Sequence, residues 1–180
     1  MLTDAVVAIA MTLLVLPLVE LAGDVDSHHL GDFLRDHRDV LLSFAVSFVV
    51  IYVFWAAHGS AFRRLTVAKA ETVPALRQLN LWWLLVIAFL PFPTAVVGRD
   101  LNTASAPVYI GTMFVLSVLT TAMMSVVGRA TGTSRRVRWA WLTTAVFALC
   151  TLVSLVNADV GMFALLLLAV VRVIEVRLLR

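Results

Sequence analysis

Charged residues are scarce in this chain. Only 14% of the 180 residues are Asp, Glu, Lys or Arg, whereas 62% are hydrophobic, and the mean hydropathy is +0.99. A soluble globular domain has about 25% charged and about 45–50% apolar residues, and a chain of this size can bury only a limited share of its surface. The composition therefore excludes an ordinary water-soluble domain and predicts a protein that resides in a lipid bilayer.

Cysteine is almost absent. Cys150 is the single cysteine, and it lies within an apolar run. One thiol forms no disulfide framework and no Cys-based zinc or redox motif. We expect neither a cofactor nor a bound metal.

The apolar residues fall into segments long enough to cross a bilayer as helices, for which about 20 residues are needed. None of them shows the strict alternation of a barrel strand, and lipid requires the backbone to satisfy its own hydrogen bonds. We therefore predict an all-α fold, with residues 1–180 forming a single transmembrane domain of six helices. The predicted helices span residues 4–22, 40–57, 79–97, 107–127, 139–156 and 160–177. The connections are too short for a soluble catalytic domain, and no nucleophile is paired with a base, so an enzyme is not expected.

Basic residues are distributed unequally between alternate loops. Eleven of the fourteen Lys and Arg lie after the second and fourth predicted helices and at the C-terminus, and only Arg35, Arg38 and Arg99 lie on the other side. The positive-inside rule then predicts a multi-pass protein of the cell membrane with both termini cytoplasmic. Because these residues sit in short loops beside the membrane, no nucleic-acid role is expected. The N-terminal segment carries Asp4 and no basic residue before Arg35, so we interpret it as a retained helix rather than a signal peptide.

The first helix has a stripe with helical period. Ile9, Thr12, Leu13 and Leu16 stand at i, i+3, i+4 and i+7, which places them on one face. The opposite positions are no more polar, so the period alone leaves three surroundings open for this face: lipid, protein or a pore. We expect other positions, such as Val6, to face lipid.

Three separated motifs carry a family resemblance. The first helix reads L-T-D-A-V-V-A-I-A-M-T-L-L-V-L from Leu2, the second ends F-W-A-A-H-G-S-A-F-R-R from Phe54, and the third contains L-P-F-P-T at 90–94. Together they resemble the prokaryotic branch of the TMEM175 family of potassium-permeable channels. The resemblance covers the first three helices, whereas the last three match only in hydropathy and spacing. Leu2 and Thr3 depart from the Phe and Ser of the family motif, whose upstream Arg the printed sequence does not reach.

The resemblance implies a homotetramer in which potassium ions permeate a central pore lined by helix 1. Ile9 matches the narrowest hydrophobic position, and Thr12, Leu13 and Leu16 match the following layers. The chain has no TVGYG-like carbonyl filter, so any potassium preference is expected to arise from these layers. Four Thr12 hydroxyls would offer oxygen contacts to ions, and Ala8 replaces a serine that the family often has. Apart from other subunits and the permeant ion, membrane lipids are the expected partners.

Asp4, His58 and Asn80 form a second group, because each lies toward the predicted cytoplasmic end of its helix. The resemblance implies a polar network there that holds helix 1 against its neighbours, together with Trp82 or Trp83. Simpler interpretations stay open: an N-cap for the first helix, an interfacial histidine and ordinary belt tryptophans.

The predicted connection between helices 1 and 2 is rich in Asp and His. A solvated outer loop, a funnel that concentrates cations and a transition-metal site are its three interpretations. Two other functions also stay open. A small secondary transporter would have two related halves with broken helices in matching positions, and a membrane assembly protein would give no ion flux.

Overall fold

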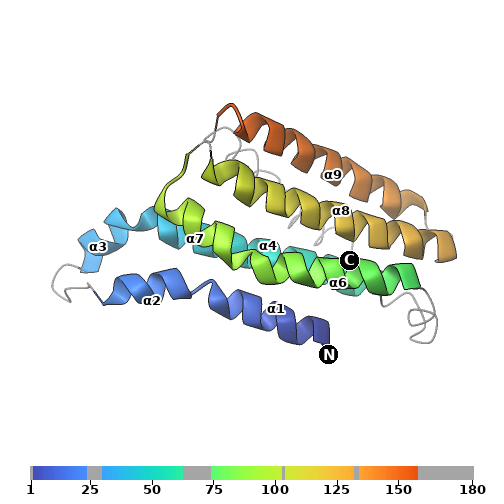
Figure 1. The fold of residues 1–180 in the computed structure, drawn as a ribbon, viewed down its shortest axis with the longest axis horizontal. Coiled ribbons are helices and arrows are strands. Elements are labelled where there is room, and N and C mark those ends of the chain that lie inside the picture. The colour runs from blue at the N-terminus through green and yellow to red at the C-terminus, as the bar shows by residue number, and fades with distance from the viewer. Residues whose placement is uncertain (1, 24–29, 63–73, 103, 132–133, 158–180) are drawn as a thin grey trace.

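The described part of the computed structural model, residues 2–23, 30–62, 74–102, 104–131 and 134–157, is helical apart from short turns and connections. Its helices are α1 (Leu2–Leu13), α2 (Leu16–Ala22), α3 (Leu30–Asp36), α4 (Arg38–Phe62), α6 (Pro74–Phe89), α7 (Pro91–Arg99), α8 (Ser105–Thr131) and α9 (Ser134–Ser154). The long helices lie side by side along one direction, with α1 and α9 at opposite edges of the bundle (Figure 1). α9 packs on α8, and α1 packs mainly on α6.

Among the described residues, four helical spans are long and apolar enough to cross a membrane: Leu2–Leu21, Arg38–Phe62, Pro74–Arg99 and Ser105–Arg129. At 1.5 Å per residue, the 25 residues of α4 extend about 38 Å, which exceeds a hydrocarbon core of about 30 Å. The apolar helix Ala140–Ser154 is shorter. The predicted sixth helix, 160–177, lies outside the described residues.

Two of the predicted spans are broken helices. Proline has no N–H and its ring clashes with the carbonyl four residues earlier, so Pro17 and Pro91 each stand in the first turn of a new helix, α2 and α7. The bend that the Pro91–Pro93 pair favours is therefore present. At the first break, the Val15 amide turns back to the Thr12 carbonyl (3.2 Å), which tightens the chain between α1 and α2.

The connection predicted over residues 23–39 contains helix, which hydropathy did not indicate. α3 occupies Leu30–Asp36, and α4 begins at Arg38 rather than at residue 40. Hydropathy marks only the part of a helix that lipid covers, whereas backbone hydrogen bonding continues through the polar residues at its ends. For the same reason, α8 and the end of α4 extend several residues beyond their apolar cores.

Hydroxyl groups join the helices inside the bundle. The Ser47 hydroxyl on α4 contacts Thr94 of α7 (2.9 Å) and Tyr109 of α8 (2.7 Å), and all three side chains are buried. Thr144 of α9 bridges Ser117 and Thr121 of α8 in the same way. Small polar residues between helices allow close approach and supply cross-helix hydrogen bonds in a bilayer.

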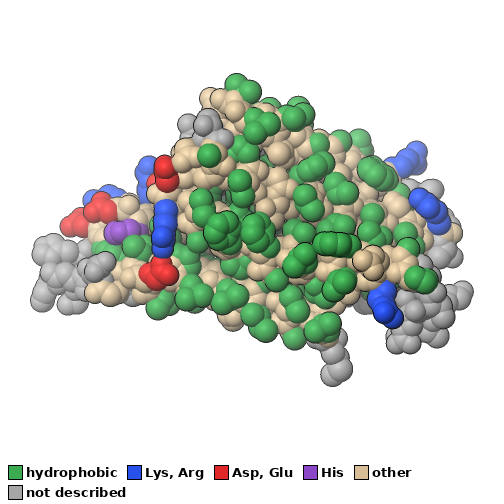
Figure 2. Space-filling model, viewed as in Figure 1, with side chains coloured by type: hydrophobic (Ala, Val, Ile, Leu, Met, Phe, Trp, Pro, Cys, Tyr) green, Lys and Arg blue, Asp and Glu red, His purple; other side chains and the backbone are tan. Residues whose placement is uncertain are grey.

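The outer surface of this bundle is apolar along its middle and charged at its ends (Figure 2). Large side chains such as Leu149, Leu142 and Leu85 are more than half exposed. The face in Figure 2 has the acidic residues at the α3 end, while Lys and Arg side chains lie at both ends. Such a belt suits a helical bundle that lipid surrounds.

Candidate functional site

One face of α1 is turned away from the rest of the subunit. Val7, Ala10 and Leu14 are buried, with 1–3% of their surface exposed. On the other side, Ile9 is 58% exposed, Leu13 is 40% exposed, and Leu16 at the start of α2 is 48% exposed. Thr12 is also exposed. The structure therefore places all four residues of the predicted stripe on a surface that the subunit itself leaves uncovered.

The expected position of Val6 is wrong. Its side chain is half-buried and packs against the core cluster of the bundle. Val6 precedes the buried Val7 and stands one helical turn before Ala10, so the same period that exposes Ile9 turns Val6 toward the protein.

The hydrogen bond made by the Thr12 hydroxyl determines which of its atoms an ion could contact. The Oγ1 atom donates a hydrogen bond to the Ile9 carbonyl (2.8 Å), one turn earlier in α1. A hydroxyl has one proton and two acceptor lone pairs. With the proton engaged by the backbone, the lone pairs of Thr12 remain on the exposed face, where a cation could meet them.

The side chains of Asp4, His58 and Asn80 take part in two separate hydrogen-bonded pairs. His58 Nε2 of α4 lies 2.7 Å from Asn80 Oδ1 of α6. The Asp4 carboxylate on α1 accepts a hydrogen bond from Trp55 Nε1 of α4 (3.0 Å). Trp55 and His58 stand at i and i+3 on one face of α4. Together the two pairs connect α4 to both α1 and α6.

Aromatic rings enclose His58 on both sides. Its ring stacks on Trp83 of α6 at a centroid distance of 4.4 Å and on Phe62 of its own helix at 4.5 Å. Trp83 is fully buried, and its indole N–H donates to Thr120 of α8 (3.0 Å). Of the two tryptophans proposed for the network, Trp83 belongs to it, while Trp82 is half exposed.

In the sequence, Trp55 stands out only as part of the F-W-A-A-H-G-S-A-F-R-R motif, so its hydrogen bond to Asp4 was not predicted. The spacing of polar and aromatic residues along α4 and α6 indicates that these side chains meet. Trp55 and His58 are three residues apart on α4, and Asn80 and Trp83 are three apart on α6. Two facing helices with paired i, i+3 positions bring four such side chains to one depth.

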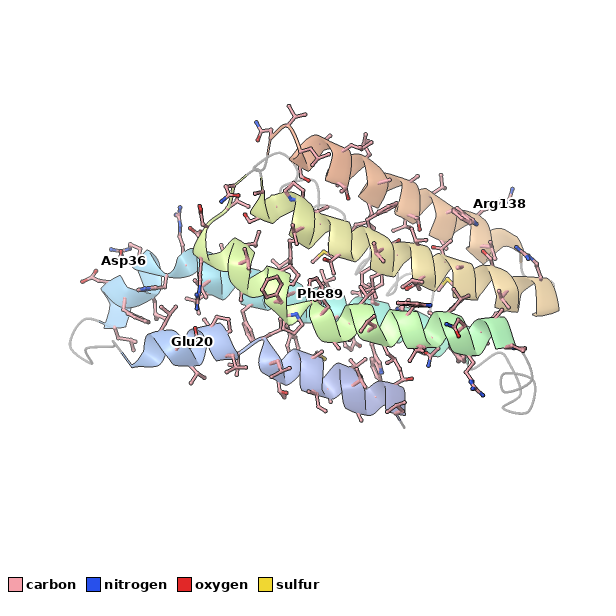
Figure 3. All side chains as sticks on the ribbon, in the orientation of Figure 1. Glu20, Asp36, Phe89 and Arg138 are labelled. Atoms are coloured by element: carbon pink, nitrogen blue, oxygen red, sulfur yellow. The ribbon has the colours of Figure 1, made fainter. Side chains whose placement is uncertain are left out.

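Ionic groups mark the opposite end of the first span. Glu20 of α2 forms an ion pair with Arg99 of α7 at 2.5 Å, and Figure 3 labels Glu20 at this end of the bundle. Asp32 and Arg35 pair on α3 at 3.6 Å. Among the described residues, no group of three His, Cys, Asp or Glu could hold a metal ion, and His28 and His29 lie outside that part of the chain.

The fold and the site define an all-helical integral membrane protein whose first span presents a mostly apolar stripe outside its own bundle. A family model described as "Endosomal/lysosomal potassium channel TMEM175" matches residues 1–91. The chain belongs to the TMEM175 family.

Two relatives extend this comparison. A protein of Streptomyces collinus named as a potassium channel is 35% identical over 103 residues, which are 56% of this chain and 46% of that relative. The chain is thus matched to less than half of that protein's length. The crystal structure of a lysosomal potassium-selective channel TMEM175 homolog from Chamaesiphon minutus has a TM-score of 0.81 at 22% identity. That likeness covers 97% of this chain and 94% of the other, and it shows a shared fold.

Proposed function

We propose that this protein is a potassium-permeable cation channel. In this proposal, residues 1–180 form one six-helix subunit, four subunits assemble around an axis, and α1 with α2 lines the pore. The family description and the name of the Streptomyces relative support the permeant ion. The activity resides in the membrane bundle rather than in a catalytic site.

The exposed stripe of α1 is the single observation that carries the pore assignment. A monomeric membrane protein can leave such a face to lipid, but Thr12 places hydroxyl lone pairs among the exposed Ile9 and Leu13 side chains. Four copies around an axis would stack these residues as rings. An apolar ring at Ile9 would form a constriction that resists wetting, and the Thr12 ring would give oxygen contacts to a partly dehydrated ion.

The polar pairs support the same arrangement. Asp4 and Trp55 tie the start of α1 to α4, which fixes how the stripe is turned relative to the bundle. His58 and Asn80 tie α4 to α6, the helix on which α1 mainly packs. We propose that this network, composed of Asp4, Trp55, His58, Asn80 and Trp83, positions the pore helix and takes no direct part in proton chemistry.

The helix breaks argue against a secondary transporter. A transporter built from two three-helix halves would be broken at matching positions, such as its first and fourth spans. In the part of the chain that the structure describes, the breaks lie in the first and third spans, at Leu14–Val15 and at Leu90, while the fourth span, α8, is continuous from Ser105 to Thr131. A channel is therefore the better proposal for these helices.

Ion flux from liposomes that contain the purified protein tests the proposal. Potassium should leave loaded vesicles faster than sodium, and N-methylglucamine should not leave at a rate above that of protein-free vesicles. Equal rates for all three ions would indicate a non-selective leak rather than a cation channel, and no flux above the empty vesicles would contradict a potassium-permeable pore. The second result would favour an assembly protein.

A further inference from the structure

The outer part of the first span continues the exposed stripe with a charged residue. Within α2, Leu16 and Glu20 are four residues apart, so they share one helix face. Exposure agrees, because Leu16 is 48% exposed and the Glu20 side chain is 59% exposed, while Leu18 and Leu21 on the other side are half-buried. Glu20 thus stands one turn beyond the last residue of the proposed pore lining.

A cation from a different span neutralises this carboxylate. Arg99, in the last turn of α7, reaches the Glu20 carboxylate, and its own side chain is 68% exposed. The neighbouring Asp100 has another partner, because its carboxylate accepts a hydrogen bond from Asn102 (2.7 Å). Figure 3 labels Glu20 at the α3 end of the bundle.

We propose that Glu20 and Arg99 together set the charge at this mouth of the pore and so control how fast potassium enters it. The inference rests on the proposed function, in which α1 and α2 line a fourfold pore. Carboxylate rings attract cations to a channel mouth, and fields from charged clefts change association rates. Each Arg99 offsets one Glu20, so the pair itself contributes no net charge to this mouth.

Charge-neutralising variants distinguish this electrostatic role from a purely structural one, in which the ion pair only holds α2 against α7. Relative to the wild type, Glu20→Gln makes the mouth more positive by one charge per subunit, Arg99→Gln makes it more negative by one, and the double variant restores the wild-type charge. In about 0.1 M KCl, where the screening length is about 10 Å, single-channel conductance should rise roughly twofold in Arg99→Gln and fall roughly twofold in Glu20→Gln. The double variant should resemble the wild type. In about 1 M KCl the differences should largely disappear, because the screening length is then about 3 Å.

The control uses the ion pair on α3, which lies at the same end but off the pore helix. Asp32→Asn and Arg35→Gln make the same changes of charge and should leave the conductance within measurement error. Folding should survive every variant, because exposed ion pairs contribute little to stability, and conductance is measured on single assembled channels.

Three results would overturn the inference. Changes in the same direction in both single variants would indicate a purely structural role, and no change in either would place Glu20 away from the ion path. Equal effects of the α3 variants would indicate a general surface charge. A wild-type protein with no potassium conductance would instead refute the proposed function itself, and with it this inference.

Discussion

The Ile9 side chain determines how easily water enters the proposed constriction. Water inside an apolar ring loses hydrogen bonds, so Ile9→Asn should lower the barrier for every small ion. A reduction of about 0.4 kcal/mol doubles a rate, and we expect single-channel conductance to rise by roughly twofold or more. Recordings in planar bilayers measure this directly.

Leu149→Asn is the matched control for that substitution. Leu149 is 61% exposed, compared with 58% for Ile9, and it lies on α9 at the opposite edge of the bundle (Figure 1). Its replacement should leave conductance unchanged. If both variants behave alike, or if Ile9→Asn matches the wild type, the exposed face of α1 does not line the pore.

Thr12 should act through its oxygen rather than through its size. Valine has a similar shape but lacks the hydroxyl, so Thr12→Val removes a contact that a partly dehydrated potassium ion can use. We expect potassium current or the potassium-over-sodium permeability ratio to fall by roughly twofold or more. Reversal potentials with potassium on one side and sodium on the other give that ratio.

Thr151→Val controls for the loss of a hydroxyl that bonds its own helix. The Thr151 hydroxyl donates to the Phe147 carbonyl of α9 (2.8 Å), much as Thr12 donates to Ile9. This variant should conduct like the wild type. An unchanged permeability ratio and current in Thr12→Val would remove Thr12 from the ion path.

At the scale of the helices, the Asp4–Trp55 hydrogen bond links the start of α1 to α4. Asp4→Ala should therefore weaken the assembled tetramer more than it alters ion preference, and Trp55→Phe should do the same because it removes the donor. Since one bond joins the two groups, the double variant should lose little more than either single variant. The fraction of tetramer that survives heating in detergent measures the effect.

Asp36→Ala serves as the comparison, because it removes an exposed carboxylate from α3, at the opposite end of the bundle from the N-terminus (Figure 3). Its tetramer should be as heat-resistant as the wild type. If Asp4→Ala is equally resistant, the link between α1 and α4 has no structural role in assembly.

Helical period and proline chemistry made much of the arrangement predictable from the sequence. Period placed Ile9 and Leu16 on one face, and Pro91 indicated the bend in the third span; both agree with the structure. The contact of His58 with Asn80 was also expected. Hydropathy did not reveal α3, because this helix has only seven residues, three of them charged, and its hydrogen bonds are internal to the backbone.

The pairs that were missed join residues far apart in the chain. Trp55 and Asp4 meet only because α1 lies beside α4, and Glu20 meets Arg99 across 79 positions of sequence. No local pattern encodes such contacts, since they depend on how helices are turned against each other. Val6 was misplaced for the same reason: the period divides α1 into faces, but only packing decides which face is buried.

For the whole molecule, the opposite ends of the bundle should face opposite compartments. The α3 end carries most of the described acidic residues, while Arg77, Arg129 and Arg138 lie near the other ends of α6, α8 and α9. The membrane-insertion bias of Lys and Arg predicts that the second end is cytoplasmic, together with both termini.

Cysteine labelling in oriented vesicles tests this orientation, and the buried Cys150 can be replaced by alanine to give a background without thiols. Ser27→Cys, in the connection between α2 and α3, should react with a membrane-impermeant reagent only from outside. Gln78→Cys, at an exposed position in the second turn of α6, should react only from the cytoplasmic side. The two variants should react from opposite sides of the membrane. Labelling of both variants from the same side would therefore reveal vesicles that are incompletely sealed. Labelling of Ser27→Cys solely from the cytoplasmic face would reverse the topology, and it would place the Glu20 mouth of the proposed pore inside the cell.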